Sequence, residues 1–180
     1  MLRQRLSGVV LALTVNCTDA AAPPLELVQT PLLDATPWRA YAASEDPLTD
    51  HQPARVECHA AGFRLEGDQL EIDTNYCNYL LAEHPTRISI SRGTEVSIEL
   101  SHYDLTSADP AKAHAALLFG DTLVWETFID IPSAADVVQA TFRTPRALAA
   151  GEVVRVHLHN HGQNNYALAP IRVLVPETDH

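Results

Sequence analysis

Basic residues are scarce in this sequence, and this scarcity already limits what the chain can bind. Twelve lysine and arginine residues stand against 23 aspartate and glutamate residues, which gives a net charge of −11 over 180 residues. Contacts to nucleic acids and to anionic lipid head groups are built from lysine and arginine, so this deficit argues against non-specific binding to either. Hydrophobic residues make up 46% of the chain, which argues against disorder. One domain is expected at this length.

Long hydrophobic runs and common catalytic motifs are also missing. No stretch reaches the ~18 to 20 apolar residues that span a bilayer. The sequence has no Gly-x-Ser-x-Gly, no P-loop, no Gly-x-Gly-x-x-Gly and no His-Glu-x-x-His motif. Only seven glycines are available to build phosphate-binding loops. We therefore expect a protein without catalytic activity.

The first 20 residues have the three-part layout of an export signal. A basic start is followed by a short apolar run over residues 7–15 and by mostly small residues at 18–22. Residues 1–20 are therefore predicted to be a signal segment, of the secretory type or of the lipoprotein type with a lipid attached at Cys17. Either type places the protein outside the cytoplasm, as a secreted, periplasmic or outer-membrane protein. Membrane attachment is expected only through that lipid.

The chain has three cysteines and no Cys-x-x-Cys motif, so thioredoxin-like chemistry and zinc knuckles are not predicted. With Cys17 in the signal segment, Cys58 and Cys77 remain as a pair in an oxidising compartment. A disulfide between them would close a loop of about 20 residues and stabilise the fold by roughly 3 kcal/mol in the chain-entropy model. The alternative is two buried free thiols.

Alternating apolar and polar side chains predict that the rest of the chain is mostly strands. Residues 21–37 contain several prolines and are predicted to form a tether, residues 38–176 the domain and residues 177–180 a tail. The clearest strand is 95–102, where apolar side chains take every second position. The other expected strands are 38–43, 55–60, 62–66, 69–74, 87–91, 113–119, 122–131, 137–143, 152–160 and 166–175. Short strands with frequent turn signals predict an all-β fold, a single antiparallel β-sandwich or jelly roll.

Three histidines at alternate positions form the strongest local anomaly. His157, His159 and His161 would project from one face of a strand, with neighbouring Cα atoms about 6.5 to 7 Å apart. Two imidazoles at this spacing, those of His157 and His159, can reach one zinc or copper ion, with His161, His102 or His114 as a further ligand. Alternatively, the histidines form polar contacts with cross-strand partners or with a ligand. Convergent ring nitrogens would favour metal, and splayed rings over a groove would favour a ligand.

Asparagines and a tyrosine surround these histidines and make the segment a candidate for ligand contact through directional hydrogen bonds and ring stacking. Trp125 is a second candidate, either as a core aromatic or as a platform for a ring. The candidate ligand-binding residues are His157, His159, Asn160, His161, Asn164, Asn165, Tyr166 and Trp125.

Together these features predict an exported, non-catalytic, ligand-binding β-sandwich without a cofactor. A carbohydrate or another component of the cell envelope is the favoured ligand, through the association of jelly-roll architecture with such ligands. One alternative is a copper or zinc protein, of a redox or oxygenase type, that uses the alternating histidines. Another is a structural or assembly protein of the envelope, which would expose a large apolar patch.

Overall fold

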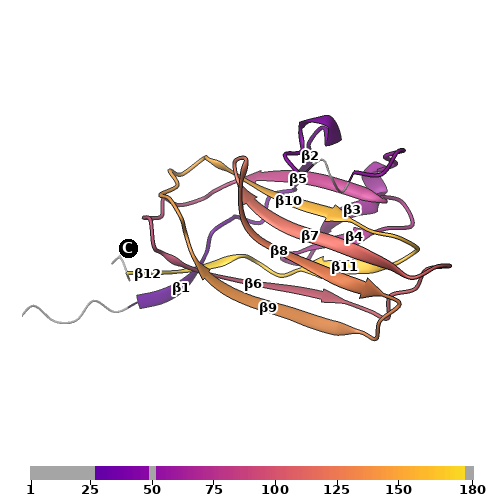
Figure 1. Ribbon diagram of the computed structural model, residues 1–180. Helices are drawn as coiled ribbons and strands as arrows, with labels where there is room; N and C mark the ends of the chain where they lie inside the picture. The colour runs from indigo at the N-terminus through magenta and orange to yellow at the C-terminus, as the bar shows by residue number, and fades with distance from the viewer. Residues whose placement is uncertain (1–26, 49–51, 177–180) are drawn as a thin grey trace, which may run out of the picture.

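The computed structural model describes residues 27–48 and 52–176 (Figure 1). The predicted signal segment, with Cys17, and the predicted tail lie outside these residues. The strands are β1 Leu27–Pro31, β2 Arg39–Ala40, β3 Phe63–Glu66, β4 Gln69–Asp73, β5 Tyr79–Pro85, β6 Glu95–His102, β7 Ala111–Phe119, β8 Thr122–Ile131, β9 Asp136–Arg143, β10 Val153–His159, β11 Asn165–Leu168 and β12 Arg172–Pro176. Two 3-10 turns, η1 Ala43–Glu45 and η3 Ala60–Gly62, complete the described elements.

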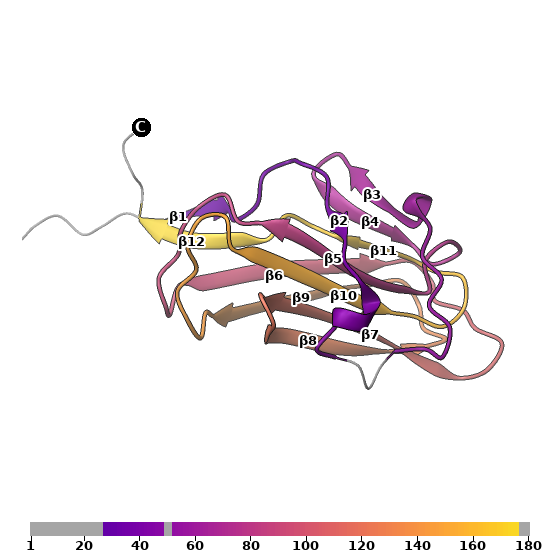
Figure 2. The same ribbon diagram turned by 90° about the horizontal axis from the view of Figure 1, so that it is seen from above.

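Two antiparallel sheets pack face to face, as Figures 1 and 2 show. Sheet A has seven strands in the order β1-β12-β6-β11-β4-β3, with β9 paired to the other edge of β6. Sheet B has five strands in the order β2-β5-β10-β7-β8. The predicted all-β, antiparallel sandwich is therefore confirmed. Within the described residues, no helix is long and apolar enough to cross a membrane.

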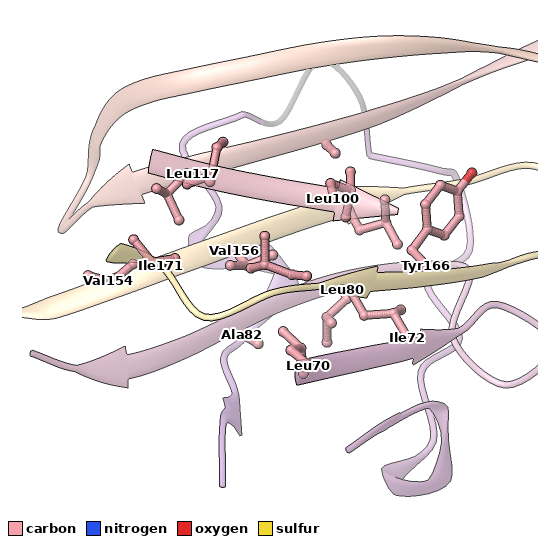
Figure 3. Packing of buried hydrophobic residues seen from close by; sticks show 14 of the residues in the cluster. Leu70, Ile72, Leu80, Ala82, Leu100, Leu117, Val154, Val156, Tyr166 and Ile171 are labelled. Atoms are coloured by element: carbon pink, nitrogen blue, oxygen red, sulfur yellow. The ribbon is translucent and has the colours of Figure 1, made fainter. Parts of the chain in front are cut away.

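The core lies between the sheets and follows the predicted alternation. In β6, Val96, Ile98 and Leu100 are buried, while the serines and glutamates between them remain partly exposed on the outer face of sheet A. Figure 3 shows how side chains from both sheets meet, with Leu70 and Ile72 of sheet A close to Leu80 and Ala82 of sheet B. Burial of these side chains removes apolar surface from water, which is the main force that holds the two sheets together.

Strand β5 is not predicted by the sequence, because its side chains are buried on both faces. Tyr79, Leu80, Leu81 and Ala82 are all buried, so no apolar–polar alternation marks the strand. The inner face of β5 contacts the core. Its outer face is covered by the segment that follows β2, which we call the strap (residues 41–48 and 52–57) and which begins with a hydrogen bond from the Tyr41 N–H to the Leu81 carbonyl.

The segment expected to be a tether belongs in part to the sandwich. Within residues 21–37, Leu27–Pro31 forms β1 and pairs with β12 at the edge of sheet A. Leu32 is fully buried, and its N–H donates to the carbonyl of Ile171. The prolines did not prevent strand formation, because β1 is an edge strand and tolerates a residue without a donor at its end.

Two expected strands are interrupted. The strand predicted over 166–175 divides into β11 and β12 around Pro170. In β8, the pairing with β7 shifts by one residue, so that Leu117 faces Trp125 while Leu118 faces Leu123. This bulge turns Leu123 outward and keeps Trp125 against the core, although simple alternation would place both on one face.

Cys58 and Cys77 form the predicted disulfide, which joins the end of the strap to the connection between β4 and β5. We expect Cys58→Ser combined with Cys77→Ser to lower the free energy of unfolding by roughly 3 kcal/mol, since the unfolded chain regains the freedom of a 19-residue separation. Urea denaturation without reductant measures the change. The wild-type protein in reductant is the control and should match the variant, whereas an unchanged midpoint would contradict the prediction.

Candidate functional site

The three alternating histidines occupy three different environments. His157 is fully buried, His159 is partly exposed at the end of β10, and His161 is exposed in the following loop. The rings of His159 and His161 lie 4.7 Å apart and are tilted. They do not form one ligand surface, because the strap covers only the strand positions near His157.

A buried carboxylate of the strap holds His157. Asp46 Oδ2 accepts a hydrogen bond from His157 Nδ1 at 2.7 Å and another from the Tyr79 hydroxyl at 2.6 Å. Oδ1 of Asp46 accepts from the Leu48 N–H at 2.8 Å. Burial alone would raise the pKa of Asp46, but the hydrogen bonds from His157, Tyr79 and Leu48 outweigh it and lower that pKa. Burial, with the bond to Asp46, raises the pKa of Tyr79 far above its usual range. This cluster fixes the strap to sheet B.

His114 lies beside His157 on the same outer face of sheet B. The two rings are 4.7 Å apart, and His114 Nε2 contacts Glu126 Oε2 at 3.0 Å. His102 lies on the other sheet, against the ring of Tyr166. Among the described residues, no three histidine, cysteine, aspartate or glutamate side chains are grouped so that they could hold a metal ion.

Three of the polar residues near the histidines form a buried hydrogen-bond network. Asn160 Oδ1 accepts from the Tyr166 hydroxyl at 2.7 Å and from Asn164 Nδ2 at 3.2 Å, while Asn160 Nδ2 donates to Thr74 Oγ1 at 2.9 Å. Asn164 Oδ1 accepts from the Thr106 N–H at 2.7 Å. These side chains therefore connect the loop after β10 to Thr74 and Thr106. Trp125 packs against the core.

A groove on the outer face of sheet A brings other polar residues together. Its main hollow has a volume of about 640 Å³, within the range typical of ligand sites. The hollow is lined by Glu66, Gln69, Glu71, Ser101, His102, Tyr103, Ala135, Asp136, Val137, Asn165, Tyr166 and Ala167. Of the residues that the sequence singled out, Asn165 lies on this outer face. Tyr166 and His102 border the hollow, but their side chains are buried at 1% and 6% exposure, at strand positions that alternate with the outer ones.

The strand register explains why the sheet is hollowed at this point. Across sheet A, Val137, Ser101, Ala167 and Glu71 face one another on four neighbouring strands. The two central residues are small, whereas the outer two are larger, so the middle of the row is a floor and its ends are walls. Tyr103, which is 74% exposed, lies where β6 ends. It presents an aromatic ring at one end of the groove.

A second hollow of about 500 Å³ adjoins the first and shares Gln69 with it. Its walls include Glu99 and Gln139, which are paired across β6 and β9, and Gln139 Nε2 donates to Glu99 Oε2 at 2.7 Å. We call the two hollows together the sheet A groove. Planar amide and carboxylate groups therefore line it on both sides of a floor of small residues.

The sheet A groove is acidic. Five carboxylate residues line it, and Arg172 is the only lysine or arginine among the described lining residues. A hydrogen bond with Glu66, together with partial burial, raises the pKa of Glu71, although Arg64 forms an ion pair with Glu71. The carboxylates are Glu66, Asp68, Glu71, Glu99 and Asp136. Such a lining attracts hydrogen-bond donors and repels anions.

Comparison with known proteins gives only remote matches. No protein-family model and no curated protein sequence matches the chain. Similar solved structures include a carbohydrate-binding module studied for specific mannan recognition, with 9% identity, 85% of this chain and 99% of that chain covered, and a TM-score of 0.47. A family 11 carbohydrate-binding module from Clostridium thermocellum, in complex with a mixed-linked tetrasaccharide, has 13% identity, covers 84% and 98%, and has a TM-score of 0.40. What this chain binds must therefore be argued from its own residues.

Most residues of the groove could not be singled out from the sequence. Gln69 and Ala167 come from two different strands and Tyr103 directly follows a third, so only the pairing of these strands brings them to one face. A weak signal was present in β6, where the outer positions carry serine and glutamate instead of long hydrophobic or basic side chains. The histidine segment is conspicuous in the sequence because three histidines alternate along it, with asparagines beside them. Several of these polar side chains form internal hydrogen bonds in the structure.

Proposed function

We propose that this protein is a non-catalytic carbohydrate-binding β-sandwich that holds a glycan chain in the sheet A groove. The observation that carries the proposal is an open groove with a floor of small residues, planar polar walls and an exposed tyrosine at one end. Amide and carboxylate groups form directional hydrogen bonds to hydroxyl groups, and an aromatic ring packs on the apolar face of a sugar. The groove is open at the surface, which suits a chain better than a small enclosed ligand.

Filling the floor of the groove should abolish binding without unfolding the protein. Ala167 is partly exposed on the outer face of β11, opposite Ser101 and Glu71, so Ala167→Trp would occupy the space between the walls. We expect wild-type protein to be retarded in native gels that contain one of a set of soluble β-glucans, mannans, galactans or xylans, and Ala167→Trp to migrate freely. Ala147→Trp, at an exposed loop position, is the control and should bind like the wild type. Equal retardation of all three proteins would contradict the proposal.

The acidic lining should discriminate against polyanionic glycans. We expect polygalacturonate and alginate to bind at least tenfold more weakly than a neutral polymer, because five carboxylates line the groove and two arginines, Arg172 and the Arg64 that pairs with Glu71, offset them in part. Glu99→Gln keeps the shape of the side chain and removes one negative charge, so it should reduce the difference in affinity between the neutral and the anionic polymers. Isothermal titration calorimetry at low and high salt measures the affinity for each polymer. Tighter binding of the anionic polymers would contradict this charge argument.

We also propose that the protein acts outside the cytoplasm, as a secreted protein or as a lipoprotein anchored through Cys17. The signal-like layout of residues 1–20 and the disulfide between Cys58 and Cys77 support export, since disulfides persist in oxidising compartments. Metabolic labelling with a radioactive fatty acid tests the anchor. Label that disappears in Cys17→Ser would support lipid attachment, and its absence from the wild type would favour secretion.

A further inference from the structure

We infer that the sheet A groove continues into a separate pocket beside Trp38, and that this pocket binds one terminal ring of the same glycan chain. The inference rests on the proposed function and adds a second binding position to it. The pocket has a volume of about 280 Å³ and is lined by residues of the connection between β1 and β2, together with Leu65 of β3 and Leu70 of β4. Figure 2 shows this connection running along the side of the sandwich. This size suits one ring and not an extended chain.

The pocket and the groove adjoin at a notch in sheet A. The second hollow of the groove and the Trp38 pocket share Asp68, Ala169, Pro170 and Arg172. The notch exists because Pro170 separates β11 from β12, so that the outer face and the side of the sandwich meet there. A chain that lies in the groove can therefore reach the pocket without crossing an intervening ridge of strand.

The lining of the pocket has two chemical characters. Its walls are apolar and include Leu33, Trp38, Leu65 and Leu168. Its rim is charged and carries two carboxylates and two guanidinium groups, from Asp34, Asp68, Arg87 and Arg172. A sugar ring has the same two characters, an apolar face of C–H groups and an edge of hydroxyls. A lipid chain or a simple aromatic molecule would pack against the walls but would form no hydrogen bonds with the rim groups.

Asp34 is held in position for such a contact. Its Oδ1 accepts from the backbone N–H of Thr36 at 3.0 Å and from the hydroxyl of the same residue, and it lies 3.4 Å from Nε2 of the buried His84. The hydrogen bonds from Thr36 lower the pKa of Asp34, so the group stays a carboxylate in mildly acidic solution. All these contacts engage Oδ1, which leaves Oδ2 to accept from a ligand hydroxyl. Trp38 is fixed beside the same histidine, with the rings 5.3 Å apart.

Ligand length separates the pocket from the groove. A disaccharide fits in the main hollow alone, whereas a hexasaccharide can extend through the notch. We expect Trp38→Ala to weaken binding of the hexasaccharide of the polymer identified in the gel panel by about tenfold, and binding of its disaccharide by less than twofold. Nearly unchanged binding of the disaccharide would also show that the variant is folded. Trp38→Phe keeps an aromatic side chain against the core and should have a smaller effect on the hexasaccharide.

Fluorescence gives a second measurement that does not depend on affinity. The chain has two tryptophans, and Trp125→Phe leaves Trp38 as the reporter. The hexasaccharide should change the emission of that variant at saturation, and the disaccharide should not. The inference is overturned if Ala167→Trp abolishes binding while Trp38→Ala binds the hexasaccharide like the wild type and the emission stays constant. If no oligosaccharide binds at any length, the proposed function itself fails.

Discussion

Replacing Asp46 by alanine is expected to lower the free energy of unfolding by about 3 to 5 kcal/mol. The carboxylate is 2% exposed and accepts from three groups, His157 Nδ1, the Tyr79 hydroxyl and the Leu48 N–H. Alanine would leave two buried donors, His157 Nδ1 and the Tyr79 hydroxyl, without this acceptor, and each costs about 1 to 3 kcal/mol when unsatisfied. The part-buried Leu48 N–H would lose its acceptor as well. The loss should be large because these bonds fix the strap over the outer face of sheet B.

A matched variant separates loss of the acceptor from loss of charge. In Asp46→Asn, the amide oxygen can take the place of Oδ2 and keep the bonds from His157 and Tyr79, while its NH2 group faces the N–H of Leu48. We therefore expect a smaller loss than for alanine. Urea denaturation at neutral pH measures the loss of stability in each of the two variants. Asp130→Ala is the control, since that exposed carboxylate pairs with Lys112 at the surface, and such pairs contribute at most about 1 kcal/mol.

Acid gives an independent test of the same cluster. The pKa of Asp46 in the folded protein is lowered from 3.8, so the carboxylate stabilises the fold above that pH and the stabilisation is lost as pH falls through the folded pKa. The difference in stability between the wild type and Asp46→Asn should therefore shrink as the pH falls below 3.8. A difference that stayed constant from neutral to acid pH would show that the charge of Asp46 does not contribute. Glycan binding by folded Asp46→Asn should be normal, because the groove lies on the opposite sheet.

The sequence predicts those parts of the fold where one face of a strand meets water. β6 has apolar side chains at Val96, Ile98 and Leu100 between polar ones, so its alternation is clear and its placement is right. The sequence does not predict β5, because the strap buries its second face. No local pattern in residues 79–85 indicates a cover that comes from residues 41–48 and 52–57. Such a cover is a long-range feature, and composition alone cannot indicate it.

The same limit applies to the site. The alternating histidines predict a metal or ligand site on one face of a strand. His157, however, donates to Asp46, which lies 111 positions away in the chain, and is fully buried there. In the groove, by contrast, a residue that the sequence does not mark lies at the centre of the candidate site. Ala167 is inconspicuous in the sequence, and its position between Ser101 and Glu71 makes it the floor of a candidate site. What a side chain does here is decided by strand register, which single-sequence reasoning cannot specify.

The second large effect is expected at Asn160, because this side chain satisfies buried groups from three segments. It accepts from Tyr166 and Asn164 and donates to Thr74. Asn160→Ala would leave the Tyr166 hydroxyl, on a side chain that is 1% exposed, without this acceptor and would open a small cavity beside it. We expect a loss of about 3 kcal/mol, from at least one unsatisfied buried group together with lost packing.

The loss at Asn160 should be coupled to its partners. In Asn160→Ala combined with Tyr166→Phe, the unsatisfied hydroxyl is absent, so the double variant should be more stable than the sum of the two single losses predicts, by about 1 kcal/mol. Urea denaturation of the four proteins gives this coupling energy. Asn75→Ala serves as the control, because Asn75 is exposed and bonds only to the neighbouring Asp73. Strictly additive losses would mean that the bond from Tyr166 to Asn160 contributes nothing to stability, and that the loop after β10 is held by Thr74 and Asn164 alone.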